Sequence, residues 1–316
     1  MSVGALSHFG FVKEITAGTM VTPVTKFFDP TSADIDDSFP REAISTMRED
    51  RAMVRSISKI TETKGNWKSP FYFNALPLWF RWAMGASTTV AAGTGWKHTF
   101  TGAQVLPSFT AEVSFYSGMA KQSAGNKVDK LTISAKAGEV AEITCDFLGL
   151  STAKNAPATV SGLPADDNLA TFSFASVTLD AVANTEIMSM ELGVENNLEA
   201  IDTLNGTNFS TRIAEGPRKI NCGLEMDFLT QAMYDLSRAA TSKAIVLEFL
   251  STVMAGGAGQ PYKAIFTMPI VKFANVSSPI EADGIISQKI DAVPLYDTAT
   301  STDLKIEVVN SDVAYT

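Results

Sequence analysis

The chain has 316 residues, of which 45% are apolar and 19% charged, so it can bury a sizeable core and is not disordered throughout. Its formal net charge of −9 argues against a protein that grips nucleic acid through a basic surface. The charge is uneven, because residues 1–160 hold 16 Lys and Arg against 14 Asp and Glu, whereas residues 161–316 hold 9 against 20. Frequent Gly and Thr and short alternating runs of Val and Ile favour antiparallel β-structure.

The first residues, MSVGALSHFGFVKEI, lack the basic start and long apolar run of a signal peptide. The most apolar segment, residues 71–87, is too short to span a bilayer, and Asn74, Pro77 and Arg81 interrupt it. We therefore expect a protein that is made in the cytoplasm and has no membrane anchor of its own.

Two long polar segments, residues 29–56 and 194–211, are longer than a hairpin needs, and such loops are usually functional or disordered. Within the first, DIDDS (34–38) resembles the start of a calcium loop, but Phe39 and Ser45 replace the required glycine and glutamate. We expect a solvated loop there. The basic stretch at 48–59 contains acids at alternating spacing and predicts a charged strand face or a subunit contact.

A strand that runs directly into a helix is predicted around residues 67–84. Apolar and small side chains alternate and then follow at helical spacing: Trp67, Ser69, Phe71 and Phe73, then Leu76, Trp79, Phe80 and Ala83. Asn74 is placed to cap the helix, and Pro77 to lie in its first turn.

The same pattern returns in the second half of the chain. The corresponding side chains are Ile220, Cys222, Leu224 and Met226, then Leu229, Ala232, Met233 and Leu236. Asp227 takes the capping place of Asn74. Upstream, KITETKGNW (59–67) aligns with RIAEGPRKI (212–220) without a gap.

The order of elements after each helix also repeats. Strands are predicted over 108–115 and 244–251, followed by a strand, a connection and a second strand over 129–150 and 263–296. Residues 154–168, rich in Ala, Pro, Gly and Asp, are predicted as a linker. We therefore predict a mainly β fold with minor helix, made of two tandem antiparallel β-barrel or sandwich units, each with one packed helix. The units span 1–160 and 161–316.

Recognisable catalytic or metal-binding constellations are missing from the sequence. His8 and His98 belong to no metal motif, and Cys145 and Cys222, in apolar runs, are predicted to be buried free thiols. The run AGGAGQP (255–261) has no lysine after its glycines and is predicted as a hairpin tip. We predict no catalytic, cofactor-binding or metal-binding residues, no cofactor and no enzyme activity.

Two regions resemble the major tail tube proteins of long-tailed bacteriophages. GFVKEITAGTMVTPVTKFFDP (10–30) resembles their opening, with Gly10, Glu14, Gly18, Thr19 and Pro23 in place. LPSFTAEVSFYSG and residues 125–150 are similar to their central strands. SMELGVENNLEAIDTLNG (189–206), with Asn196, Asn197 and Leu204, and IAEGPRKINCGLEMDFL (213–229) extend the match over nearly the whole chain.

The resemblance implies a structural protein of the virion tail, made in the host cytoplasm. In this family, β-barrel subunits join their sheets side by side into rings, and the rings stack into a hollow tube through which DNA is ejected. Loops and a terminal arm lock one ring to the next.

The partners that the resemblance implies are further copies of the chain, the tape measure, tail terminator and distal tail proteins, and double-stranded DNA that passes without sequence-specific binding. Since most family rings contain six β-units, a chain with two units predicts a trimer with pseudo-sixfold symmetry rather than a hexamer. We expect an acidic lumen that repels phosphate.

Assembly is expected to depend on the two long polar segments, so deletion of 31–45 should block tube growth and leave a folded subunit. Trp79 and Trp82 exceed what one core needs and are expected to contact a neighbouring unit. The alternatives are a tail-hub or baseplate protein built on the same unit and a non-viral tandem β-sandwich binding module.

Overall fold

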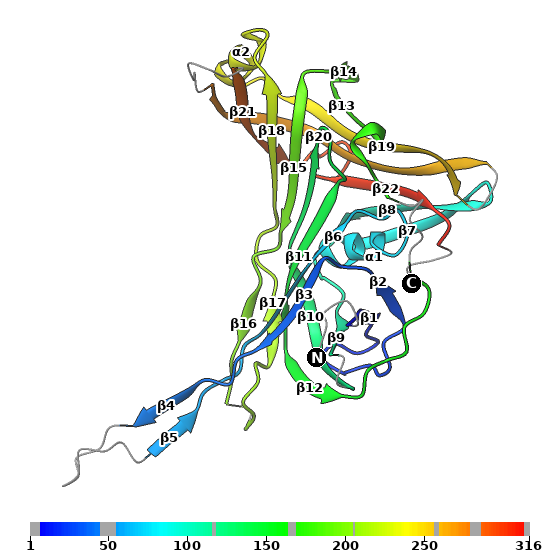
Figure 1. Cartoon of the computed structure of the whole chain (residues 1–316). Helices are drawn as coiled ribbons and strands as arrows, with labels where there is room; N and C mark the ends of the chain where they lie inside the picture. Colours follow the sequence, from blue (N-terminus) through cyan, green and yellow to red (C-terminus); the bar gives the residue numbers. More distant parts are fainter. Residues whose placement is uncertain are drawn as a thin grey trace.

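The computed structural model describes residues 7–44, 55–115, 118–163, 169–204, 206–255, 259–278 and 286–312. It is mainly β-structure, with two α-helices, so the predicted fold class is confirmed. In the described part of the chain, eighteen strands are joined by ladder hydrogen bonds and curl into a barrel, from which two separate two-stranded ribbons extend (Figure 1).

The first half of the chain, up to residue 160, supplies twelve described strands and one helix. They are β1 (Phe9–Lys13), β2 (Lys26–Phe28), β3 (Ser32–Asp37), β4 (Arg41–Ile44), β5 (Arg55–Ser58), β6 (Thr63–Pro70), α1 (Pro77–Met84), β7 (Gly85–Ala92), β8 (Gly95–Gly102), β9 (Phe109–Phe115), β10 (Met119–Lys136), β11 (Glu142–Gly149) and β12 (Ser151–Asn155).

The second half begins its described structure with a short 3-10 helix, Phe172–Phe174. Its further elements are β13 (Ala175–Leu179), β14 (Val182–Asn184), β15 (Ile187–Glu195), β16 (Glu199–Ile201), β17 (Arg212–Ala214), β18 (Lys219–Asp227), α2 (Ala232–Arg238), β19 (Lys243–Ala255), β20 (Gln260–Ser277), β21 (Ser287–Leu295) and β22 (Lys305–Asn310).

The two halves repeat the same antiparallel pairing order. In the first half the ladders run β2–β1–β9–β10, then β10 pairs with β11 and β12, β11 with β6, and β6 with β3. In the second they run β14–β13–β19–β20, then β20 pairs with β21 and β22, β21 with β18, and β18 with β15. The ribbons β4–β5 and β16–β17 also correspond, as do α1 and α2, whereas the β7–β8 hairpin follows α1 only.

Two further ladders connect the halves. Residues Lys130–Lys136 of β10 pair with β15, and β22, near the end of the chain, pairs with β8. One hydrophobic cluster contains side chains of both halves. The division into units at residues 1–160 and 161–316 stays a prediction. The repeated pairing order is the observation that supports it.

The strand–helix joint at residues 67–84 lies at the centre of this core. All eight side chains of the predicted pattern, from Trp67 to Ala83, are buried, and the helix begins at Pro77 as expected. The predicted cap is wrong, because Leu76 occupies the N-cap position and the side chain of Asn74 bonds Ser311 Oγ at 3.0 Å instead.

The second joint differs more from its prediction. The strand residues from Ile220 to Met226 are buried in alternation as expected, but α2 starts after Gln231, and Asp227 ends β18 rather than capping the helix. Of the predicted stripe, Met233 is buried, whereas Leu229 is 63% exposed. Helix α2 thus covers its core with fewer apolar side chains than α1 does.

Aromatic residues of the strand–helix joint do contact the other half, but they are not the predicted ones. Trp79 and Trp82 are fully buried and pack against rings of their own half, for example edge-to-face against Phe11 at 5.1 and 5.5 Å between centroids. The contacts to the second half come from three phenylalanines: Phe71 with Phe249 (5.7 Å), Phe80 with Phe266 (5.6 Å) and Phe73 with Tyr262 (5.8 Å).

Three predictions for loops have different outcomes. Residues 34–37 lie in β3, so the predicted solvated loop is wrong. Residues 55–58 of the basic stretch form the exposed strand β5, and residues 48–54 lie outside the described part. Ala255 and Gln260 face each other at the end of the β19–β20 hairpin, as expected for a tip at 255–261, of which residues 256–258 lie outside the described part.

Candidate assembly surfaces

A polar face crosses both halves of the chain. Residues directly opposite one another in neighbouring strands share a face of the sheet, and one row across β3, β6, β11, β10, β15 and β18 runs Asp34, Asn66, Asp146, Lys130, Glu195, Lys219. The adjacent row on the other face runs Ala33, Trp67, Cys145, Leu131, Val194, Ile220. The sheet therefore buries one continuous apolar face and exposes one continuous polar face.

Acids and bases are interspersed on this polar face. Lys130 Nζ lies 3.2 Å from Glu195 Oε1, and Lys68 Nζ lies 2.7 Å from Glu142 Oε2. Partial burial raises the pKa of Asp146, against the lowering effect of Lys130. The charged residues of the face include Asp34, Asp36, Glu142, Asp146, Glu191, Glu195, Glu225 and Asp291, and Lys64, Lys68, Lys130, Lys136, Lys219, Lys272 and Lys289.

Asn196 fastens the two halves together beside the β10–β15 ladder. Its buried side-chain amide donates to Ala83 O at 3.0 Å, at the end of α1, and to Val128 O at 2.9 Å, where β10 is bulged. Its backbone amide donates to Asp129 O at 2.8 Å. The side chain thus satisfies two carbonyls of the first half from the second.

Charged contacts reinforce the same junction. Lys127 of β10 forms an ion pair with Glu215, and this contact outweighs burial, which alone would raise the pKa of Glu215, so that the pKa is lowered. Within the second half, Arg218 makes a bidentate contact with Asp303, at 2.9 Å to each carboxylate oxygen, and this contact positions its guanidinium against the first half. The guanidinium lies directly over Gly102 of β8, where a Cβ would meet its nitrogen at 2.0 Å.

Hydrogen bonds to the first half hold the end of β22 in place. Asn310 Nδ2 donates to Phe73 O at 2.7 Å, and Ala75 N donates to Asp312 Oδ2 at 2.9 Å. His98, buried on β8, contacts Asn310 Oδ1 at 2.9 Å through Nε2 and Thr89 Oγ1 at 2.9 Å through Nδ1. Burial lowers the pKa of His98, so the folded chain holds this imidazole neutral near pH 7.

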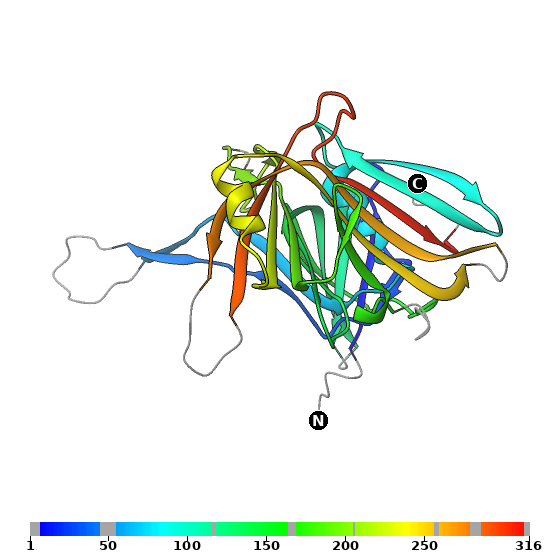
Figure 2. The ribbon, with the colours of Figure 1, turned by 90° about the horizontal axis from the view of Figure 1, so that it is seen from above.

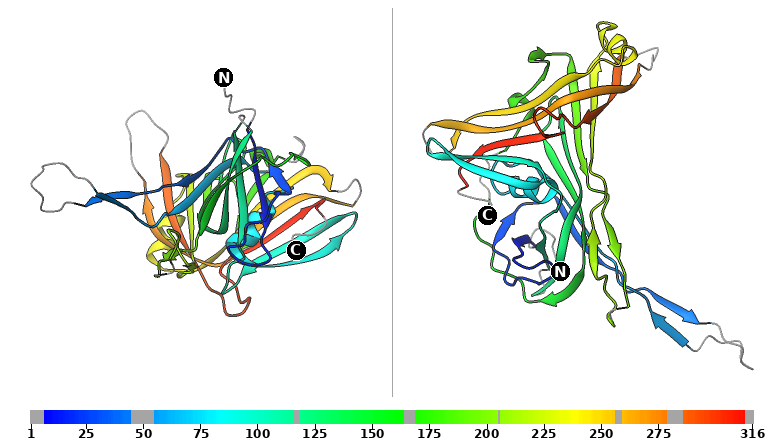
Figure 3. Two further views of the ribbon diagram at one scale, coloured as in Figure 1. Left: turned by 90° about the horizontal axis from the view of Figure 1, so that it is seen from below. Right: turned by 180° about the vertical axis from the view of Figure 1, so that it is seen from behind.

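Ribbon β4–β5 carries exposed apolar side chains away from the body. Ribbon β4–β5 is exposed at every residue of both strands, and Phe39, before it, is 61% exposed. Both ribbons extend toward the same end of the molecule (Figures 1 and 3). The base of β4–β5 touches the loop that joins β16 to β17, since Thr61 N donates to Asn208 O at 2.6 Å. Seen from above, β4–β5 projects well beyond the body (Figure 2). Protruding apolar surface of this kind is typical of interaction sites.

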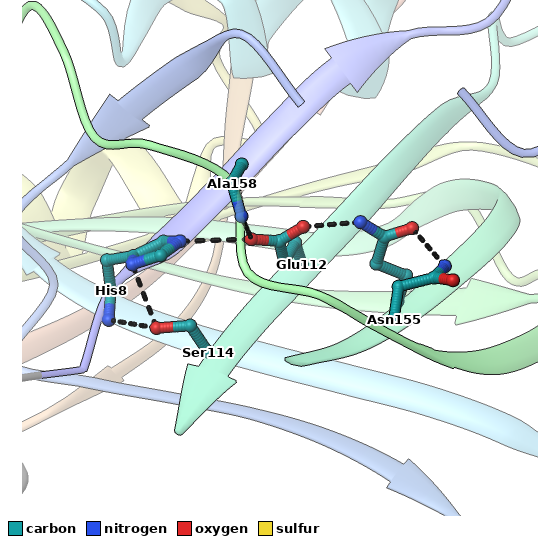
Figure 4. A network of polar contacts seen from close by, with 6 residues as sticks. His8, Glu112, Ser114, Asn155 and Ala158 are labelled. Atoms are coloured by element: carbon teal, nitrogen blue, oxygen red, sulfur yellow. Dashed lines mark hydrogen bonds and ion pairs between the residues drawn. The ribbon is translucent and has the colours of Figure 1, made fainter. Parts of the chain in front are cut away.

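A buried carboxylate on β9 connects the residue before β1 to the linker after β12 (Figure 4). Glu112 Oε1 accepts from Ala158 N at 2.8 Å and lies 3.0 Å from His8 Nε2, and its other oxygen accepts from Gln122. Ser114 Oγ lies 2.8 Å from the second ring nitrogen of His8. The network anchors residue 8 and residue 158 to the same strand, β9, and so closes the first half at both ends.

The segment 10–30 is fixed by a second buried carboxylate. Glu14 accepts from Gly125 N at 2.8 Å, from Thr110 Oγ1 at 2.9 Å and from Gly18 N at 2.9 Å. Gly18 and Gly125 both have positive φ angles, of 80° and 69°. Gly10 leaves no room for a Cβ, which would lie 2.6 Å from Val24 Cγ2. Glu14, Gly18 and Gly10, which carried the family resemblance, therefore have structural roles in the fold.

Metal-binding clusters are missing from the described residues. Within those ranges no three His, Cys, Asp or Glu side chains are grouped so that they could hold a metal ion. Cys145 and Cys222 are buried free thiols as predicted, and burial raises the pKa of Cys222 to about 12. Among the described helices, none is long and apolar enough to cross a membrane.

Residues 4–293 match a family model described as phage tail tube protein. The chain belongs to the phage tail tube protein family. This is a family of structural proteins of the virion tail rather than of enzymes, so the tail tube role is confirmed at that level. A search of curated proteins finds no match.

The residues that carried the family resemblance differ in their surroundings. Asn196 is buried at the junction described above, and Asn197, at a φ of 48°, donates to Pro217 O at 2.7 Å. Leu204 is fully exposed near the end of ribbon β16–β17. Sequence patterns missed the buried Glu112, although a lone acid within the apolar strand SFTAEVSF is a usable signal, because buried carboxylates need partners.

Replacing Asn196 with Ala should destabilise the folded chain, because two buried carbonyls lose their donor. The expected cost is about 1–3 kcal/mol in the free energy of unfolding, measured by urea denaturation. Asn275→Ala is the matched control, because Asn275 is exposed and donates only at the surface, to Asp291 at 3.0 Å. Equal costs for the two variants would contradict the role assigned to Asn196.

Acidification should destabilise the chain in part through His98. The unfolded state takes up a proton below a pKa of about 6.5, whereas the folded state, in which that pKa is lowered, does so only at lower pH. Stability is therefore retained above pH ~6.5 and falls below it, by at most about 1.4 kcal/mol per pH unit from this group. Urea titrations between pH 7.5 and 5 should show a steeper loss for the native chain than for His98→Gln, and parallel curves would refute the assignment.

Proposed function

We propose that the chain is the repeating subunit of the tail tube, and that three copies close a ring of six similar β-units. The observation that supports this most strongly is the repeated pairing order, in which each strand of the second half has a counterpart in the first. The internal β10–β15 ladder already joins one unit to the next by their sheet edges. Repeating that junction from chain to chain closes a ring.

In this proposal the polar face of the sheet lines the channel. The remaining layers of each unit pack against the opposite, apolar face, where α1 and the strands β1, β2 and β9 lie. A ring with those layers inside would crowd all six bodies into its centre. Placing the bodies outside leaves an open channel, since only side chains of the polar face then point inward.

The charge of this face leads us to modify the expected acidic lumen. Its acids and bases are close to balanced, and several lysines are held in ion pairs such as Lys130–Glu195 and Lys68–Glu142. Paired lysines have little positive charge left for DNA phosphates, so the wall neither binds DNA strongly nor repels it strongly. We propose that double-stranded DNA passes along this wall without sequence-specific contacts during ejection.

The rings stack in this proposal through the exposed ribbons, whose apolar side chains include Phe39, Ile44 and Ile57. The ends of the finished tube then contact the tail terminator and distal tail proteins, and its interior holds the tape measure protein during assembly. Synthesis takes place in the host cytoplasm, and the assembled product belongs to the virion.

Electron microscopy of the purified chain tests the proposal directly. We expect long hollow tubes whose image averages show three chains per ring and six similar subvolumes. Six chains per ring would overturn the trimer, and rings that never elongate would favour a hub or baseplate protein. A chain that remains monomeric at all concentrations would refute the assembly itself.

Removal of ribbon β4–β5 should block stacking and leave the subunit folded. The deletion of 31–45 expected from the sequence is poorly placed, because it removes β3 and the fully buried Ile35. Residues 41–58 can instead be replaced by a short Gly–Ser turn, since Lys59 N donates to Pro40 O at 2.9 Å and the cut ends already meet.

The expected result for this variant is an unchanged circular dichroism spectrum and urea midpoint, with no tubes by electron microscopy. Val182→Ser, which changes an exposed apolar residue on β14 away from both ribbons, is the control and should assemble normally. Normal tube growth by the ribbon variant would remove the ribbon from the stacking contact.

A further inference from the structure

Two strand segments at opposite ends of the long sheet have one edge without a ladder partner in the described chain. Strand β3 pairs with β6 alone, and residues 272–277 of β20 pair with β21 alone. Between them lie six strands: β6, β11, β10, β15, β18 and β21. Unpaired backbone amides and carbonyls at such edges are ready to pair with another chain.

The internal junction between the halves shows what each of these edges accepts. Residues 120–123 of β10 pair with β9 and β12 at once, so these two strands lie on opposite edges of β10. Residues 130–134 likewise pair with both β11 and β15. Because β11 and β12 follow each other along one edge, β15 continues the edge on which β9 ends.

Strand β20 repeats this arrangement but lacks the last partner. Its residues 263–267 pair with β19 and β22, and Val271 pairs with β19 and β21, so β19 occupies one edge alone. The β19 ladder ends at Val271, and the edge from Lys272 to Ser277 is vacant in the described chain. This is the place that β15 fills on β10, and the counterpart of β15 in the pairing order is β3.

We propose, resting on the ring assembly above, that β3 of one copy adds to β20 of the next copy as an antiparallel neighbour at Lys272–Ser277. The partner is therefore a second copy of this chain, joined by the same ladder that joins the two halves internally. We place Asp34 opposite Lys272, because this register sets an acid opposite a base on the polar face.

Charge supports this pairing. On the polar face of the internal ladder, Lys130 of β10 lies opposite Glu195 of β15, at 3.2 Å. On the same face, β20 carries Lys272 and β3 carries Asp34 and Asp36. The junction between chains thus repeats a base on the β20 side and acids on the β3 side.

The free part of β3 is also the part that the junction needs. Lys121 of the same half donates to Ile35 O at 3.3 Å and to Asp37 Oδ1 at 2.6 Å, which holds the C-terminal end of β3 to its own unit. The stretch Ser32–Asp34 has no such contact across its outer edge among the interactions described, and Ser32 and Asp34 are exposed.

Disulfide cross-linking tests the junction. Asp34→Cys is combined with Lys272→Cys or with Ala274→Cys, which covers a register shift of two residues, and the buried native cysteines do not compete. Oxidation of assembled material should convert a double variant into covalent dimers and trimers on non-reducing gels. A mixture of the corresponding single variants should give dimers and nothing larger, which proves that the bond joins different copies.

The matched control pairs Asp34→Cys with Val90→Cys, an exposed residue on β7, which also has an unpaired outer edge in the described chain. We expect at least tenfold less cross-linking with this control. Tubes that form normally but link β3 to β7, or to neither strand, would overturn the proposed edges and leave the tube function intact. Absence of any assembly by the unmodified chain would refute both the proposed strand edges and the tube function.

Charge exchange gives a second measurement that needs no oxidation. Lys272→Glu should raise the concentration at which tubes form several-fold, since acids then face Asp34 and Asp36 across the junction. Combining it with Asp34→Lys and Asp36→Lys should restore most of the loss. An equal defect in the single and the combined variants would contradict the pairing.

Discussion

The architecture depends on the hydrogen-bonding demand of strand edges. A strand presents backbone amides and carbonyls on two sides, and each side needs a partner if it is not exposed to water. Strand β10 meets this demand with four partners, β9 and β15 along one edge and β11 and β12 along the other. Strand β15 belongs to the second half. Its pairing with β10 therefore satisfies an edge of the first half and at the same time connects the two halves.

Among the described residues, the two similar halves do not pair all their strand edges. The first half uses its long strand to hold β15, whereas the equivalent place on β20 and the outer edge of β3 have no described ladder partner. Both unpaired edges correspond to the two sides of the internal β10–β15 ladder. They are therefore expected to fit each other as β10 and β15 do. A ring is the simplest arrangement in which a repeated junction of this type leaves no edge free, and the number of chains then depends only on the angle between neighbouring units.

Alternation and element order were predictable from the sequence because they depend on local chemistry. The buried sets at Trp67–Phe73 and Ile220–Met226 follow from the period of two that any half-buried strand obeys. The helix caps were not predictable, because Asn74 found a partner, Ser311, that lies far along the chain. The role of Trp79 and Trp82 was predicted wrongly for a related reason. Strands β1 and β2 bring Phe9, Phe11 and Phe28 to the helix, and no sequence pattern predicts that contact. Asp34 and its neighbours failed as a loop because three acids in six residues suppress a strand prediction, whereas pairing with β6 and the burial of Ile35 overrides that propensity.

The assembly surfaces were visible in the sequence only as excess length, and the structure changes what their charge means. Net charge suggested a wall that repels DNA, but the register places lysines and acids opposite one another on the polar face. A conduit has two requirements that conflict, since strong attraction would hold the DNA in place and strong repulsion would oppose its entry. Ion pairing across the ladder avoids both, because each pair has a small net charge and its field decays within about a Debye length of 8–10 Å. The same pairs also add cross-strand contacts to the sheet. In the proposed tube, the interactions that hold neighbouring strands together would therefore also keep the wall from binding the DNA that passes along it.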